Sequence, residues 1–183
     1  MRIISGTHKG RRIMAPKNLP VRPTTDMAKE ALFNILRHQI HIPGTKVLEL
    51  FAGSGNMSYE FASRGAAAIT AVDQHYPCIS FIKKTAETLE FPIDTIKADV
   101  FSFLTKHRGT YDLIFADPPY GLEQAEFHQL ADLVMEAELL APGGIFIMEH
   151  SKHTNMEEHP HLDNSRRYGG TVFSFFNGPE EEE

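Results

Sequence analysis

The chain has 183 residues, of which 42 % are hydrophobic and 23 % charged, and its formal net charge is −6. These values are typical of one globular domain and exclude a fibrous or disordered chain. No apolar stretch reaches the roughly 20 residues that cross a bilayer, and one cysteine excludes an internal disulfide. The N-terminus lacks the apolar segment of a signal peptide, so we expect a cytoplasmic protein.

Residues 1–22 form a basic arm. They contain none of the chain's 24 acidic residues and six of its 18 basic ones, namely Arg2, Lys9, Arg11, Arg12, Lys17 and Arg22. A basic arm on an acidic body is common in proteins that bind a polyanion, although it also occurs as a solvated end. At the other end, residues 178–183 read GPEEEE, and we expect them to be a disordered acidic tail.

The arm is expected to begin with two short strands, over 1–6 and 11–16. Thr24 or Thr25 is then expected to cap a helix, because a hydroxyl oxygen can accept a hydrogen bond from a free amide of the first turn. Apolar residues at helical spacing continue this helix to about Ile40.

Strands and helices alternate from Lys46 onward. The apolar, β-rich runs expected as strands are 47–51, 67–72, 94–98, 111–116 and 144–150. The amphipathic segments expected as helices are 56–64, one from Pro77, one after Asp99 and one that includes 127–137. This alternation predicts a doubly wound, mostly parallel α/β sheet with helices on both faces. Residues 166–176, with Gly169–Gly170 at the turn, predict a C-terminal β-hairpin with one antiparallel strand.

Open α/β sheets bind ligands at the carboxyl ends of their strands. The first strand ends in the sequence ELFAGSG over 49–55, in which Gly53 and Gly55 allow a close approach of the backbone to a ligand. A dinucleotide fingerprint would need a third glycine where Ser58 stands. The alternative is a turn with a structural role only.

Two aspartates end the next strands. Asp73 can accept hydrogen bonds from both ribose hydroxyls of a nucleoside, or it can cap the following helix. Asp99 can accept from an adenine amino group, or cap its own helix, or do both. A pyrophosphate would prefer basic groups and a helix N-terminus, so this acidic lining suits a cationic, adenosine-bearing ligand.

The fourth strand ends in Asp117, Pro118, Pro119 and Tyr120, the most specific signal in the chain. Two prolines remove two amide donors and stiffen the backbone, so the Pro118 carbonyl stays available to an external donor. Asp117 adds a second acceptor, and the ring of Tyr120 offers a surface on which a base can stack. Two acceptors and a ring are what an exocyclic amino group on a nucleobase requires.

Other residues give weaker signals. His150, His153, His159 and His161 follow no regular metal-ligand spacing. At the end of a strand His150 can contact a substrate, although we expect it to be solvent-exposed. Cys78 is expected to be a small buried apolar residue. Arg166, Arg167 and Tyr168 either extend an RNA surface or form an ordinary hairpin edge.

The ELFAGSG sequence at 49–55 and the DPPY sequence at 117–120 together resemble class I S-adenosylmethionine-dependent methyltransferases that act on exocyclic amines. With MRIISGTHKGRR at the start and VRPTTDMAKEALFNIL at 21–36, the chain resembles the RsmD family of bacterial 16S rRNA guanine-N2 methyltransferases, from residue 1 to about residue 150. Glu49 stands where the family usually has aspartate, and Ser5 replaces a usual glycine.

The resemblance implies a Rossmann-like, seven-stranded sheet over 44–177 that binds S-adenosylmethionine and releases S-adenosylhomocysteine. It implies that the cofactor contacts are Glu49, Phe51, Ala52, Gly53, Ser54, Gly55, Asp73, Asp99 and Val100, and that Asp117, Pro118, Pro119 and Tyr120 hold the guanine. It also implies that an appendage over 1–43 contacts 16S rRNA in a small-subunit particle through Lys9, Arg11, Arg12, Arg22, Thr24 and Thr25. A monomer without a metal or membrane contact is expected.

Three classes of protein remain in competition. An RNA amino methyltransferase accounts for the glycine turn, Asp73, the DPPY sequence and the basic arm together. A nicotinamide-dependent oxidoreductase accounts only for the turn and Asp73, and a non-catalytic RNA-binding assembly protein accounts only for the arm. The choice of guanine over adenine N6 or cytosine N4 rests on the family resemblance.

Overall fold

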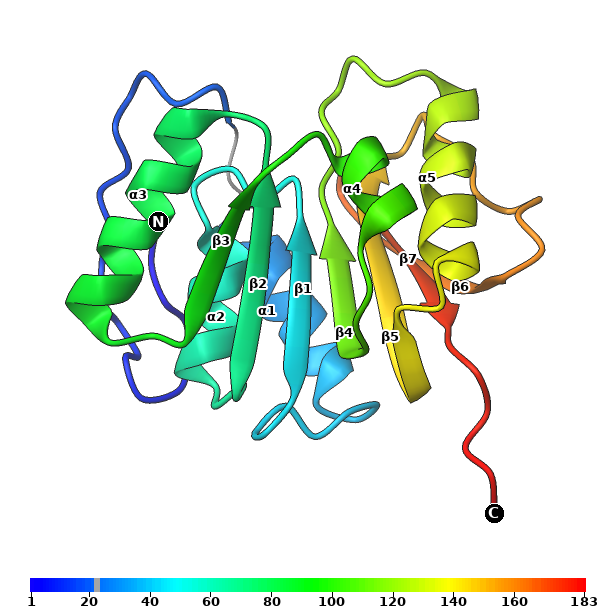
Figure 1. Cartoon of the computed structure of the whole chain (residues 1–183), viewed down its shortest axis with the longest axis horizontal. Helices are drawn as coiled ribbons and strands as arrows, with labels where there is room; N and C mark the ends of the chain where they lie inside the picture. Colours follow the sequence, from blue (N-terminus) through cyan, green and yellow to red (C-terminus); the bar gives the residue numbers. More distant parts are fainter. Residues whose placement is uncertain (22–23) are drawn as a thin grey trace.

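A computed structural model of the chain describes residues 1–21 and 24–183. Within them the strands form one seven-stranded sheet in the order β3-β2-β1-β4-β5-β7-β6 (Figure 1). The strands are β1 Lys46–Leu50, β2 Ala68–Asp73, β3 Ile93–Lys97, β4 Tyr111–Ala116, β5 Leu140–Ser151, β6 Leu162–Tyr168 and β7 Thr171–Asn177. Strands β1 to β5 pair in parallel, and β7 runs antiparallel to both of its neighbours. The predicted α/β fold with a C-terminal hairpin is confirmed.

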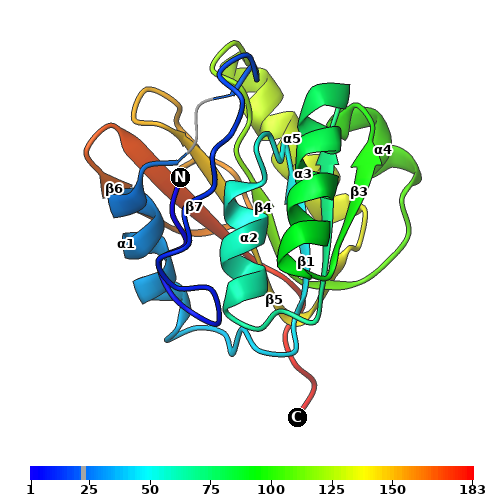
Figure 2. The same ribbon diagram turned by 90° about the vertical axis from the view of Figure 1, so that its left-hand side faces the viewer.

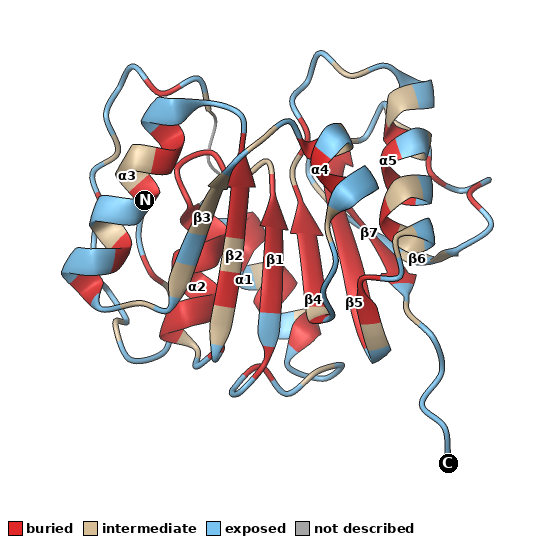
Figure 3. Cartoon of the chain, viewed as in Figure 1, coloured by how far each residue is buried: buried red, intermediate tan, exposed pale blue. Residues whose placement is uncertain are grey.

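The helices are α1 Asp26–Leu36, α2 Asn56–Ser63, α3 Tyr76–Leu89, α4 Val100–Lys106 and α5 Gln124–Glu136. Helices α1, α2 and α3 cover one face of the sheet, and α4 and α5 cover the other (Figure 2). Successive side chains of β4 point to opposite faces of the sheet. Leu113 and Phe115 pack toward α1 and α2, whereas Ile114 and Ala116 pack toward α4 and α5. The central strands are therefore buried on both sides (Figure 3).

Helix α1 shares the core of the sheet. Leu32, Phe33 and Leu36 are fully buried, and the rings of Phe33 and Phe61 of α2 meet edge to face with centroids 4.9 Å apart. Each buried side chain of this size contributes roughly 1.5–3 kcal/mol to folding. The helix ends at Leu36 instead of near Ile40, and residues 37–39 form turns.

The basic arm lies along α2 (Figure 2). Instead of two strands it contains a single antiparallel bridge between Arg2 and Arg12, because Gly6 and Gly10 adopt positive φ angles of 93° and 83° that interrupt an extended run. The side chains of Ile3, Ile13 and Leu19 are buried. The described part of the arm, residues 1–21, is therefore packed against the domain, and its five basic side chains are exposed.

A buried ion pair fastens the arm. Glu60 of α2 accepts hydrogen bonds from the amides of Ile4 at 2.8 Å and Ser5 at 3.2 Å. The Lys29 ammonium lies 3.5 Å from the Glu60 carboxylate, donates to the carbonyl of Arg2 at 2.6 Å, and both charged side chains are fully buried. These contacts join the arm, α1 and α2.

Strand β5 begins at Leu140, four residues before the expected start at 144. Pro142 and the two glycines after it lie inside the strand, where the pairing with β4 shifts between Tyr111 and Leu113. At the end of the chain, the Gly178 amide donates to the Gly144 carbonyl at 2.8 Å. No helix in the described part of the chain is both long and apolar enough to cross a membrane.

Candidate active site

A cavity of about 420 Å³ opens where β1, β2, β3 and β4 end. The predicted site residues that line it are Glu49, Phe51, Ala52, Gly53, Ser54, Asp73, Asp99, Val100, Asp117, Pro118, Pro119 and Tyr120. The carboxyl ends of parallel strands meet at one edge, which is why residues up to about 70 positions apart in sequence converge. Gly55 is the one predicted cofactor or catalytic residue that does not line this cavity.

The turn between β1 and α2 has an unusual backbone. Phe51, Gly53 and Gly55 adopt positive φ angles of 56°, 57° and 83°. A Cβ atom on Gly55 would lie 2.7 Å from the ring of Tyr59, and one on Gly53 would lie 2.8 Å from Val21 Cγ1. Gly55 thus caps α2 and packs behind the turn, whereas the missing side chain of Gly53 leaves room for Val21.

Glu49 is buried in β1 and accepts a hydrogen bond from the Ser58 hydroxyl. Burial raises the pKa of Glu49 to about 8, despite the opposing effect of the Ser58 hydrogen bonds. The side chain is therefore largely neutral at pH 7 until a cation arrives beside it. Ser58 occupies the position of the third glycine in a dinucleotide fingerprint, and here its hydroxyl group orients the Glu49 carboxyl group.

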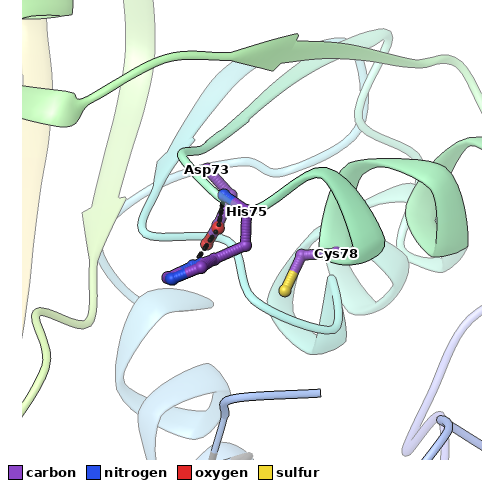
Figure 4. A group of neighbouring side chains, drawn as sticks. All are labelled: Asp73, His75 and Cys78. Carbon is purple, nitrogen blue, oxygen red and sulfur yellow. Dashed lines mark hydrogen bonds and ion pairs between the residues drawn. The ribbon is translucent and has the colours of Figure 1, made fainter. Parts of the chain in front are cut away.

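Asp73 holds the turn between β2 and α3. One of its oxygens accepts from the Gly53 amide at 2.9 Å, and the other accepts from the His75 amide at 2.9 Å and lies 3.0 Å from the His75 ring (Figure 4). Helix α3 begins after His75, so the alternative of Asp73 as its N-cap is wrong. The carboxylate lines the cavity with lone pairs available for a ligand's hydroxyl groups.

Asp73, His75 and Cys78 place donor atoms within 4.8 Å of one another (Figure 4). Metal ligation would require the Cys78 thiolate. The side chain is fully buried, as expected, and burial raises its pKa to about 11, which opposes ionisation. One Asp73 oxygen is also committed to His75. These three groups are therefore poorly suited to a metal, and its absence stays a prediction.

Asp99 caps α4, which was one of its two expected roles, while its contact with an adenine stays a prediction. Its side chain accepts from the Ser102 amide at 3.0 Å and so caps α4, and it also lines the cavity. Val100, the first residue of α4, is buried and lines the cavity beside it.

The segment from Asp117 to Tyr120 forms the wall at the end of β4. Pro118 is buried, Asp117 is half-buried, and Pro119 and Tyr120 are exposed, with 78 % of Tyr120 accessible. Desolvation raises the pKa of Asp117 well above its usual range, and the negative charge and hydrogen bond of Glu149 raise it further. This carboxyl group therefore binds a proton more tightly than an exposed aspartate.

Glu149 was not anticipated from the sequence. It lies on β5, whose register with β4 pairs Met148 with Ala116 and so brings Glu149 beside Asp117. The only sequence signal was a polar residue at the end of an apolar strand, next to the strand that carries the DPPY sequence. Its carboxyl group accepts from the Thr24 hydroxyl at 2.7 Å.

A second cavity of about 130 Å³ adjoins the first and shares Thr24, Asp117, Pro118 and Tyr120 with it. Its lining includes His150, which is buried and not exposed as expected, because its ring packs against Phe127 of α5 and contacts Ser174 of β7. The His150 ring contacts the Ser174 hydroxyl at 2.7 Å, and burial lowers its pKa, so it stays neutral.

The predicted RNA contacts have different surroundings. Lys9, Arg11 and Arg12 are exposed on the arm, and Arg22 lies outside the described residues. Thr25 caps α1 by accepting from the Ala28 amide at 3.2 Å, whereas Thr24 donates to Glu149. The two threonines thus have partners within the chain.

The family model described as Conserved hypothetical protein 95 matches residues 1–177. A Haemophilus influenzae protein named ribosomal RNA small subunit methyltransferase D is 32 % identical over 157 residues, which cover 83 % of this chain and 79 % of that protein. The protein of the same name from Escherichia coli K12 is 33 % identical over 135 residues, which cover 72 % of this chain and 67 % of that protein.

Solved structures share the fold. A hypothetical protein from Thermus thermophilus superposes with a TM-score of 0.84 at 23 % identity, covering 97 % of this chain and 99 % of that one. The T. thermophilus 16S rRNA N2 G1207 methyltransferase, solved with AdoMet and guanosine, superposes with a TM-score of 0.71 at 20 % identity, covering 87 % of this chain and 45 % of that one.

Proposed function

The chain belongs to the RsmD family, and from this premise we propose that it transfers a methyl group from S-adenosylmethionine to the exocyclic N2 amine of a guanine in 16S rRNA. The observation that carries the proposal is the convergence of Asp117, Pro118 and Tyr120 on a cavity that is otherwise lined by acidic strand ends. The names of the relatives, small-subunit rRNA methyltransferases, support the same reaction.

The cavity fits the cofactor chemically. S-adenosylmethionine is cationic, and when bound it supplies an electrophilic methyl group on a sulfonium. Glu49 is buried without an ion pair among the described residues and would hold the ammonium group of the cofactor. Asp73 would accept from the ribose hydroxyls and Asp99 would lie near the adenine, as the resemblance implies.

The opposite wall would hold the target base. Asp117 and the Pro118 carbonyl accept hydrogen bonds from the two N–H groups of the amine, which turns the nitrogen lone pair out of the base plane. Tyr120 offers a stacking surface, worth about 1–3 kcal/mol per base. Asp117 stabilises the positive charge that develops on nitrogen and accepts the proton that the methylated amine releases. The guanine must leave its stack to reach this wall.

The exposed cations of the arm would contact rRNA phosphates, and Lys9, Arg11 and Arg12 are available for this. We propose a monomeric, cytoplasmic enzyme that acts on a small-subunit particle. Thr24 joins the segment before α1 to the base-binding wall through Glu149, which supports a substrate that touches both.

The test uses ribosomal small subunits from a strain that lacks this gene. The protein is incubated with tritiated S-adenosylmethionine and either the particles or the deproteinised 16S rRNA, and the methylated nucleotide is mapped by mass spectrometry. Label in N2-methylguanine supports the proposal. Label in adenine or cytosine would change the target base, and no transfer to either substrate would favour a non-catalytic RNA-binding protein.

A further inference from the structure

We propose that Glu149 makes the site selective for guanine, by accepting a hydrogen bond from N1–H of the target base while Asp117 holds the adjacent amino group. This assignment rests on the proposed function, because it requires a base at the Asp117 wall. It adds a specificity-determining residue from β5, outside the DPPY sequence.

The position of Glu149 follows from strand pairing. Parallel pairing of β4 and β5 continues through Ala116 and Met148, so the next residues, Asp117 and Glu149, lie side by side with their carboxyl groups hydrogen-bonded. Both residues line the 130 Å³ cavity together with Pro118 and Tyr120. One small space therefore presents two carboxyl groups, a proline segment and an aromatic ring.

A structural role explains Glu149 poorly. The residue is 7 % exposed, and no lysine or arginine of the described chain forms an ion pair with it or with Asp117. A buried and a half-buried carboxyl group placed side by side without a cation destabilise a protein, and such pairs are concentrated at functional sites. The Thr24 hydroxyl holds one Glu149 oxygen, which fixes the orientation of the carboxyl group.

The hydrogen-bond pattern of the bases explains the choice of guanine. Guanine carries donors at two adjacent positions, N1–H and the 2-amino group, and two neighbouring carboxyl groups can accept from both. Adenine and cytosine have an unprotonated ring nitrogen next to the amino group. That lone pair would face the carboxylate of Glu149, and a mismatched buried polar contact strongly disfavours the wrong substrate.

The test compares guanine with 2-aminopurine, which keeps the 2-amino group but has an unprotonated N1 and no O6. Once the target nucleotide has been mapped, RNA is prepared with either base at that position, and kcat/KM is measured for both. Wild type is expected to prefer guanine by about 100-fold or more. Glu149→Gln is expected to reduce this ratio by about 10-fold or more, because the amide of glutamine can donate to an unprotonated N1.

Glu157→Gln is the matched control, because Glu157 is exposed, lies outside both cavities and undergoes the same chemical change. Its ratio should equal that of wild type. An unchanged ratio in Glu149→Gln, even with both rates lowered, would leave Glu149 as a supporting residue and overturn the proposal. If Glu149→Gln does not fold, the wild-type protein still tests the proposal. Equal values of kcat/KM for guanine and 2-aminopurine in wild type would also overturn it. If the proposed function itself is wrong, the result is different, because the wild-type protein then transfers no methyl group to guanine.

Discussion

The carboxyl groups of Asp117 and Glu149 are hydrogen-bonded to each other at the ends of two adjacent strands. Burial raises the pKa of both groups, and the charge of Glu149 raises the pKa of Asp117 further. The pair therefore holds a proton at a pH where two exposed carboxyl groups would both be ionised.

This proton predicts a pH dependence. A carboxyl group with a raised pKa must lose its own proton before it can accept the proton that the methylated amine releases. The single-turnover rate of methyl transfer should therefore rise with pH and then level off. Glu149→Gln removes the charge that raises the pKa of Asp117, so the rise should move to lower pH. Stopped reactions with a saturating cofactor measure this, and an identical pH profile in both proteins would contradict it.

Asp117→Asn tests the base-binding wall. The amide cannot stabilise a positive charge on the amine as a carboxylate can, so we expect the single-turnover rate to fall by about 100-fold or more. Cofactor affinity, measured by calorimetry, should stay unchanged, and Asp94→Asn on the exposed face of β3 is the control. Transfer at the wild-type rate in Asp117→Asn would remove this residue from the mechanism.

Glu49 predicts that cofactor binding releases a proton. Its pKa is about 8 in the free protein, so it is mostly protonated at pH 7, and an ammonium group beside it would lower that pKa. Affinity should therefore increase as the pH rises toward 8. Calorimetry at pH 7 in two buffers of different ionisation enthalpy should show a different binding heat in each, corresponding to about one proton.

Glu49→Gln is the companion variant. It should bind the cofactor more weakly, release no proton and be more stable than wild type at pH 8, because a neutral amide avoids the burial of a charge. Each kcal/mol of stabilisation would raise the Tm by about 2–4 °C. Equal binding heats in both buffers for wild type would rule out Glu49 as the group that titrates.

The periodicity of the sequence was sufficient to predict the sheet, because buried parallel strands and amphipathic helices each leave a local pattern. The acids at strand ends were found because they follow those strands directly. Glu149 and the Lys29–Glu60 pair were missed, since their roles depend on which strand lies beside β4 and on where the arm packs. His150 was misjudged for the same reason, because the groups that pack around its ring, Ser174 of β7 and Phe127 of α5, are distant in sequence.

The exposed charges of the arm predict the salt dependence of RNA binding. Deleting the arm would also remove the buried Ile3 and Ile13, so we prefer to replace four exposed cations by glutamine. These are Lys9, Arg11, Arg12 and Lys17. Removing one phosphate contact should reduce the log–log salt slope by about 0.7, so the four replacements together should flatten it by up to about 3.

The matched control for the arm replaces Lys83 and Lys84, which are exposed on α3. Cofactor affinity should be unchanged in both variants, because none of these cations lines either cavity. A salt slope that stays at the wild-type value in the arm variant would place the RNA contact elsewhere on the molecule.

Lys29→Met tests whether the buried ion pair fastens the arm. Among the described residues, the substitution leaves Arg64 as the one cationic partner of the buried Glu60 carboxylate, and it removes the donor that holds the Arg2 carbonyl. Loss of one member of a buried pair typically costs about 3–5 kcal/mol, which urea unfolding would detect.

The amides of Ile4 and Ser5, which donate to Glu60, should also exchange faster with solvent, because the arm is no longer held on both sides. Lys83→Met, at an exposed position of α3, should change neither quantity. Normal protection of both amides in Lys29→Met would mean that Glu60 and Arg64 hold the arm without the lysine.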